Sequence, residues 1–117
     1  MKRTRRSERV SGLLLEEVSR VVLRVVKDPR ISGVTFTSVR VSPDLRFARV
    51  YFSVVGGPRK QEEALRGFQS AKGVIKRELG RTLELQYVPE IEFVFDDSME
   101  YAQHIEELLQ KIRNGKA

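Results

Sequence analysis

The sequence predicts an α+β domain in which helices pack on one small sheet. Apolar residues recur every three or four positions near both ends of the chain and between residues 61 and 79, as in amphipathic helices. Between residues 34 and 55, β-branched and aromatic residues alternate with polar ones, as in strands. The 117 residues, 40% of them hydrophobic, fit a single domain over residues 1–117 with one small core.

The first helix is expected to begin near Ser7, a residue type that caps helix N-termini. It must end before Pro29, because the residue ahead of a proline is pushed towards extended geometry. Residues 1–6 are then a basic N-terminal arm. The apolar face of this helix consists of Val10, Leu14, Val18, Val21, Val22 and Val25.

Two strands are expected at 34–42 and 47–55, and the turn at 43–46 makes them an antiparallel hairpin. Gly56-Gly57-Pro58 stops the second strand. A third strand is expected within 84–95, where Pro89 marks either a bulge or the true start of the strand.

Between these strands, a helical pattern begins at Gln61, and Gly80 is a natural cap at its end. Gly73 interrupts the pattern, and an interior glycine costs a helix roughly 1 kcal/mol relative to alanine. We therefore expect two helices that meet at a kink formed by Ala71 and Gly73, with Ser70 as the cap of the second helix.

A last helix is expected over residues 98–113, with Asp97 and Glu100 as a capping box and residues 114–117 frayed. Its outer face is acidic, and we expect it to pack loosely on the body. The whole order is α-β-β-α-kink-α-β plus a C-terminal helix. With the third strand parallel to the first in a three-stranded mixed sheet, this order describes a type II K-homology (KH)-like domain.

The charge of the chain favours a polyanionic partner. The net charge is +6, and residues 1–30 alone carry nine Lys or Arg against four Asp or Glu. Such a field steers a protein towards nucleic acid, whereas the simpler interpretation is solubility alone.

The kink is the first candidate RNA-binding site, because KH domains clamp nucleic-acid backbone where two helices meet at a glycine-rich loop. The alternative is that Gly73 only allows close helix packing while the lysines form a solvated face. The kink candidates are Ser70, Lys72, Gly73, Lys76, Arg77 and Arg81.

Three further clusters are candidates. The N-terminal cations can lie along RNA or be a solvated end. Arg40 and Arg49 belong, with Tyr51, to one sheet face, where cross-strand packing under a helix that buries Phe47 is the favoured alternative. Arg59 and Lys60 can touch phosphate or keep their loop hydrated. The N-terminal candidates are Lys2, Arg3, Arg5, Arg6 and Arg9.

Residues for catalysis or metal binding do not assemble in this sequence. Asp96 and Asp97 are neighbours whose side chains diverge, so we interpret them as turn and cap residues. His104 is the only histidine, and the chain has no cysteine, no phosphate-binding loop and no dinucleotide fingerprint. We expect no enzyme activity, no metal site and no cofactor. No segment approaches the length of a membrane span, and we expect a cytoplasmic monomer.

Several short motifs occur together in this chain: Lys27-Asp28-Pro29-Arg30, Ser42 to Tyr51, Ser70-Ala71-Lys72-Gly73, Arg81, Val88 to Ile91, and Asp96 to Ser98. In their order and spacing they resemble the ribosome-binding factor A family over about residues 5 to 112.

This resemblance implies a non-catalytic RNA chaperone with a KH-like fold that binds the immature small (30S) ribosomal subunit and its 16S rRNA. It further implies support of late maturation and rRNA processing, action in cold adaptation and release with help from an assembly GTPase. The alternative function is a basic interaction module that docks on an acidic protein partner.

Overall fold

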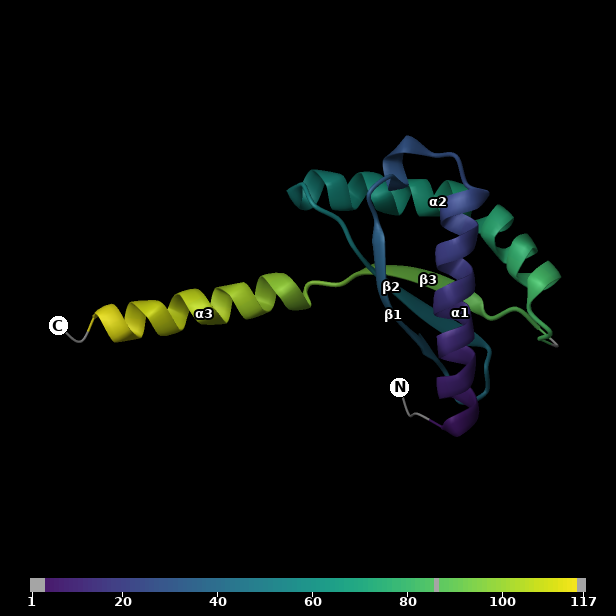
Figure 1. The fold of residues 1–117 in the computed structure, drawn as a ribbon, viewed down its shortest axis with the longest axis horizontal. Coiled ribbons are helices and arrows are strands. Elements are labelled where there is room, and N and C mark those ends of the chain that lie inside the picture. The colour runs from purple at the N-terminus through teal and green to yellow at the C-terminus, as the bar shows by residue number, and fades with distance from the viewer. Residues whose placement is uncertain (1–3, 86, 116–117) are drawn as a thin grey trace.

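The computed structural model describes residues 4–85 and 87–115 as three α-helices, one short 3-10 helix and three strands (Figure 1). They are, in chain order, α1 (Arg5–Arg24), η1 (Pro29–Ile31), β1 (Thr35–Val41), β2 (Phe47–Ser53), α2 (Gly57–Thr82), β3 (Glu90–Phe95) and α3 (Ser98–Asn114).

The three strands form one mixed sheet in the order β1-β2-β3. β1 and β2 are an antiparallel hairpin, whereas β3 pairs with β2 in parallel. The prediction that the third strand runs parallel to the first was therefore wrong. The chain crosses from β2 to β3 through α2 as a single β-α-β unit, and such a unit returns the chain to the same end of the sheet.

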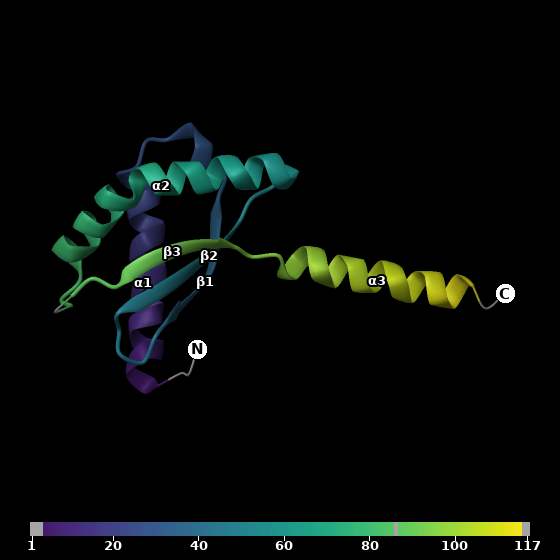
Figure 2. The ribbon, with the colours of Figure 1, turned by 180° about the vertical axis from the view of Figure 1, so that it is seen from behind.

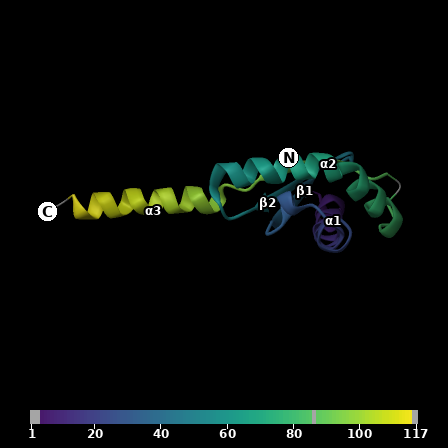
Figure 3. The same ribbon diagram turned by 90° about the horizontal axis from the view of Figure 1, so that it is seen from above.

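One face of the sheet is covered by α1 and α2, and the core lies between them (Figure 3). Leu14 and Val18 of α1, Val50 of β2 and Ile75 of α2 are fully buried there. A second cluster lies under the start of α2, where Phe68 stacks on Phe93 with ring centroids 4.3 Å apart. This packing fixes α2 against the edge strand β3.

The first helix begins earlier than predicted, because Thr4 and not Ser7 is its N-cap. The Thr4 hydroxyl accepts from the Ser7 N–H at 3.1 Å, and the Ser7 hydroxyl accepts from the Thr4 N–H at 2.8 Å. This reciprocal capping box satisfies two N–H groups at the helix start. Arg5 and Arg6, predicted as part of a basic arm, therefore belong to α1.

The expected pair of helices is one helix in the structure. α2 is helical at every position from Gly57 to Thr82, so no loop separates two helices and Ser70 caps nothing. Gly80 also lies inside the helix, and Leu83 is the C-cap. The helix does change direction along its length, as Figures 1 and 2 show. Ser70 and Gly73 are of the residue types at which helices bend, so the bend needs no break.

The third strand begins at Glu90, directly after Pro89, so Pro89 marks the start of the strand and not a bulge. The irregular register lies instead in β1, between Phe36 and Ser38. The turn at 43–46 is present, and Leu45 adopts a positive φ of 60° in it. No described helix is long and apolar enough to span a membrane.

The second face of the sheet carries no helix. Phe47, expected to be buried there, is 53% exposed. α3 extends away from the body, and none of its described residues is buried (Figures 1 and 2). Its start also differs from the prediction, since Asp97 makes no side-chain cap bond and the Asp96 carboxylate accepts from the Ser98 N–H at 2.9 Å instead.

Candidate nucleic-acid interface

Many basic side chains of the described residues form ion pairs with carboxylates. Arg81 pairs with Glu78 at 3.0 Å, Lys76 with Glu90 at 3.2 Å, and Arg49 with Glu92 at 3.5 Å. Phosphate attracts unpaired cations most strongly, because paired ones are already partly neutralised. The candidate cations that form no ion pair within the described ranges are Arg5, Arg6, Arg9, Arg40, Lys72 and Arg77.

Two of these cations line a groove with a volume of about 830 Å³. Arg6 and Arg9 reach it from the start of α1, because they lie one turn apart on the same helix face. Lys76 reaches it from the C-terminal part of α2, and Arg46 from the β1–β2 turn. Three segments far apart in the sequence therefore direct four cations to one groove.

The groove also carries two exposed aromatic rings, Tyr87 at 76% and Phe47 at 53% exposure. Exposed rings beside cations suit unpaired bases, which stack on aromatic faces while the phosphates meet the cations. Neither ring was among the residues predicted to bind RNA. Tyr87 precedes Pro89 in a loop, and the hairpin position of Phe47 had indicated burial.

Carboxylates moderate the charge of this groove, because Asp44, Glu84 and Glu90 line it beside the four cations. The pKa of Asp44 is lowered by the Ser42 hydroxyl, which donates to its carboxylate at 2.6 Å, and by the Arg46 N–H. Asp44 therefore stays ionised, and the lining has an excess of one positive charge. Binding of a polyanion here depends on local geometry as much as on net charge.

A second groove of about 450 Å³ adjoins the first, since Phe47 and Glu90 line both. Lys72 and Gln69 of α2 form one wall of the second groove, and Arg49 belongs to the sheet side. The two grooves run along β3 and join Lys72 and Lys76 of α2 to the start of α1. We call this surface the β3 groove; its basic residues are Arg6, Arg9, Arg46, Arg49, Lys72 and Lys76.

Gly73 is exposed, and a Cβ atom added there would meet no atom within 4 Å. The interpretation that Gly73 allows close helix packing was therefore wrong. Close packing occurs instead at Gly67, where an added Cβ would lie 2.6 Å from Ile31 Cγ2. Ser70 also contacts η1, because its hydroxyl accepts a hydrogen bond from Arg30 Nη2 at 3.1 Å.

The two remaining kink candidates, Arg77 and Arg81, lie in different environments. Arg77 is exposed and does not line the β3 groove. Arg81 lies one turn further and is paired with Glu78. The pKa of Arg20 in α1 is raised mainly by its hydrogen bonds to Glu17, and the negative charge of Glu78 raises it further. This end of α2 is a network of alternating charges.

Arg40 and Arg49 are register partners on the uncovered face of the sheet, and Tyr51 is half-buried beside them. The favoured interpretation, packing under a helix, was wrong for this face. Arg40 lines a smaller groove of about 320 Å³ between β1 and α1, which also holds Glu8. Arg40 thus lines a different groove from its register partner Arg49.

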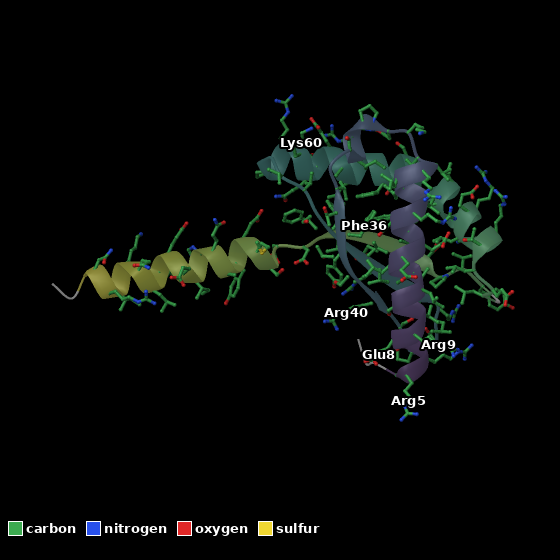
Figure 4. All side chains as sticks on the ribbon, viewed as in Figure 1. Arg5, Glu8, Arg9, Phe36, Arg40 and Lys60 are labelled. Carbon is green, nitrogen blue, oxygen red and sulfur yellow. The ribbon has the colours of Figure 1, made fainter. Side chains whose placement is uncertain are left out.

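The prediction that Arg59 and Lys60 lie in a loop was wrong, because α2 begins at Gly57 and both residues belong to its first turn. Figure 4 shows Lys60 at the opposite end from Arg5 and Arg9. Both Arg59 and Lys60 are paired with Glu63, at 3.7 Å each. These two residues do not join the β3 groove. Lys2 and Arg3 lie outside the described residues.

The described residues contain no cluster of three or more metal-ligating side chains. His104 is exposed on α3, away from the sheet. The pKa of Asp96 is lowered by hydrogen bonds from the hydroxyls of Ser98 and Thr37, so this carboxylate joins β1 to the start of α3. The chemistry available in the β3 groove is anion and base binding.

Comparison with known proteins gives consistent matches. A family model described as ribosome-binding factor A matches residues 6–109. Ribosome-binding factor A of Dictyoglomus thermophilum is 45% identical over 108 residues, which are 92% of this chain and 90% of that protein. The corresponding protein of Halothermothrix orenii is 43% identical over 113 residues, or 97% of this chain and 92% of that one.

The fold has relatives among solved structures. The crystal structure of ribosome-binding factor A from Thermus thermophilus superposes with a TM-score of 0.69 and 25% identity, covering 76% of this chain and 93% of that one. The match confirms the predicted α+β, KH-like fold of helices packed on a three-stranded mixed sheet.

Proposed function

Because this chain belongs to the ribosome-binding factor A family, we propose that it binds the immature small ribosomal subunit through the 16S rRNA and assists late maturation of that rRNA. The proposal describes a non-catalytic RNA chaperone that acts in the cytoplasm as a monomer, and whose release an assembly GTPase assists. The observation that carries it is the convergence of Arg6, Arg9, Arg46 and Lys76 on one groove with exposed aromatic rings.

The proposed contacts divide into two kinds. Cations of the β3 groove meet phosphates and supply affinity, which falls as salt rises because bound counterions are released. Tyr87 and Phe47 stack on unpaired bases, which favours single-stranded or unstacked rRNA over a regular duplex. Base stacking on aromatic rings is worth roughly 1–3 kcal/mol per base.

Gly73 has a separate role in this proposal. Its exposed backbone has no side chain to hold a ligand away, so an rRNA phosphate can approach the helix there closely. Lys72 and Lys76 lie on either side of it along α2. Ser70 acts indirectly, because its hydroxyl is already engaged by Arg30.

Binding energy alone can perform this function. A protein that binds one rRNA conformation more tightly than another shifts the population towards the first by the ratio of the two affinities. A 100-fold preference corresponds to about 2.7 kcal/mol, which two or three phosphate and stacking contacts can supply. No bond of the rRNA needs to be broken by this chain.

The test compares two triple charge reversals on the same helix. Lys72→Glu, Lys76→Glu and Arg77→Glu alter the C-terminal part of α2, and Arg59→Glu, Lys60→Glu and Arg66→Glu alter its N-terminal part. We expect the first variant to lose sedimentation with immature small subunits and the second to keep it. Circular dichroism and urea unfolding check that both variants fold.

If the first triple variant folds and still sediments with small subunits as the parent chain does, the rRNA proposal is wrong. The basic surface would then be an interaction module for an acidic protein partner. Crosslinking to immature subunits, with the crosslinked positions mapped in both rRNA and protein, separates these outcomes by direct observation of the partner.

A further inference from the structure

The uncovered sheet face and α3 are two unpartnered surfaces of one chain. On the sheet, Phe47 is 53% exposed, and Tyr51 and Val94 are half-buried beside it. On α3, five apolar side chains recur at three- and four-residue spacing and form one stripe. The stripe consists of Tyr101, Ile105, Leu108, Leu109 and Ile112, all between 37% and 67% exposed.

We propose that the uncovered face of the sheet is the docking surface of α3 of the same chain. In the structure α3 extends into solvent, so the structure represents an undocked state (Figure 2). A helix of 17 residues that makes almost no tertiary contact is only marginally stable in water, because helices in proteins depend on packing of their apolar face. Docking would provide that packing.

The connection to β3 permits a docked position. Only Asp96 and Asp97 separate Phe95 of β3 from Ser98 of α3, and two-residue connections between a strand and a helix are common. Asp96 is fixed to the sheet, since its N–H donates to Phe52 O at 2.7 Å and its carboxylate accepts from the Thr37 hydroxyl at 2.7 Å. The change of direction is therefore confined to Asp97 and the first turn of α3.

The lengths of the two surfaces match. A helix of 17 residues spans about 25 Å, and a six-residue strand spans about 20 Å. If α3 folds back antiparallel to β3, its stripe therefore runs over Tyr51 and Phe47 from one end of the sheet to the other. Docked α3 covers Phe47, so docking of α3 and stacking of an rRNA base on Phe47 exclude one another.

Charges in this orientation also match. Glu106 lies about 12 Å along α3, and the row of Arg40 and Arg49 lies about 10 Å back from the end of β3. Lys111 lies about 20 Å along α3, and Glu90 about 17 Å back along β3. Glu106 thus lies level with Arg40, which forms no ion pair within the described ranges, and Lys111 lies level with Glu90, which already pairs with Lys76 at 3.2 Å.

The charges on the two flanks of the α3 stripe also match those on the two sides of the sheet. Glu106 and Lys111 lie on opposite flanks of the stripe at 3.6 residues per turn. β-α-β units are right-handed in almost all proteins. With that hand, Glu106 faces the β1 side, where Arg40 lies, and Lys111 faces the β3 side, where Glu90 lies. The reverse placement would oppose like charges.

The test is a distance measurement between two spin labels on the full chain. The chain has no cysteine, so Pro43→Cys and Asn114→Cys introduce the only two labelling sites. Pro43 lies in the turn beside the start of β3, and Asn114 is the last residue of α3. The labels should be about 40 Å or more apart when α3 is extended and below about 25 Å when it is docked.

We expect a short-distance population that is independent of protein concentration. Leu108→Asp with Leu109→Asp should abolish it, whereas Gln103→Asp with Gln110→Asp, which adds the same charge on the opposite side of α3, should not. Long distances alone in the parent chain would overturn the proposal. Short distances that appear only between singly labelled chains after mixing would also overturn it, because α3 would then dock on a second copy.

Discussion

Gly67 of α2 lies directly against Ile31 of η1, so that a Cβ atom at position 67 would stand 2.6 Å from Ile31 Cγ2 and 3.2 Å from Arg30 Cβ. This close approach brings the segment after α1 onto α2, where Asp28 binds Arg30 and Arg30 binds Ser70. Gly73, six residues further along the same helix, has no such neighbour.

Alanine at these two glycines should have opposite effects. Gly67→Ala overpacks the contact with Ile31, and the higher helix propensity of alanine offsets only part of that cost. The free energy of unfolding should therefore fall by about 1–2 kcal/mol. Gly73→Ala meets no atom within 4 Å and should raise it by about 0.5–1 kcal/mol. Urea unfolding of both variants measures the difference. Equal effects at the two positions would contradict this assignment.

Phe68 should be among the most costly side chains to truncate. It is 1% exposed, stacks on Phe93 and lies 5.1 Å from Phe52 between ring centroids. Phe68→Ala should lower the free energy of unfolding by about 3–5 kcal/mol, because the cavity lies between α2 and the sheet. Leu65→Ala, one turn away and 40% exposed, is the control and should cost much less. Calorimetry or denaturant unfolding compares the two variants.

Acid should destabilise the η1 region through Asp28. The hydrogen bonds from the Arg30 side chain, followed by that from the Arg30 N–H, hold the pKa of Asp28 below its usual range. The ionised carboxylate therefore contributes stability above the unfolded pKa of about 3.9, and that contribution is lost as the pH falls through the lower folded pKa.

Asp28→Asn should consequently lower the midpoint of urea unfolding at pH 7. Between pH 4 and pH 2.5 the midpoint of this variant should fall less than that of the parent chain. Asp97→Asn, which removes a carboxylate that makes no cap bond, is the control and should keep the parental slope. A parental slope in Asp28→Asn would show that the Arg30 contact does not persist in solution.

Affinity for rRNA should fall steeply with salt. If about five phosphates are neutralised, a plot of log affinity against log salt has a slope of roughly −3.5 to −4.5. Arg9→Ala and Lys76→Ala should each reduce the magnitude of this slope by about 0.7–0.9, since each removes one phosphate contact. Arg59→Ala, at the far end of the molecule, should leave it unchanged. Filter binding at several salt concentrations provides the slopes.

Most of the fold could be predicted from the periodicity of apolar residues. The hairpin, the strand after Pro89 and the last helix lie within a few residues of their predicted positions. The bent helix was predicted as two, because an interior glycine weakens a helix without necessarily interrupting it. The partner of β3 was not predictable from local patterns, since pairing depends on how α2 crosses the sheet.

The candidate site was predicted in part. Arg6, Arg9 and Lys76 were chosen for their charge, and they converge because α1 and the end of α2 meet beside the β1–β2 turn. Arg46 and Tyr87 were missed, since a turn residue and a loop residue have no periodicity to mark them. Arg59 and Lys60 were included on charge alone, and only the structure shows that they share one carboxylate, Glu63, and do not line the β3 groove.

The reciprocal bonds between Thr4 and Ser7 have a consequence for the cations beside them. Because α1 is capped at Thr4, Arg6 and Arg9 project from an ordered backbone before any ligand binds. A flexible arm would lose conformational entropy on binding, of about 1–2 kcal/mol for each backbone residue that becomes fixed. Preorganisation at this end of α1 removes that loss, so the arginines can add their full attraction to the complex.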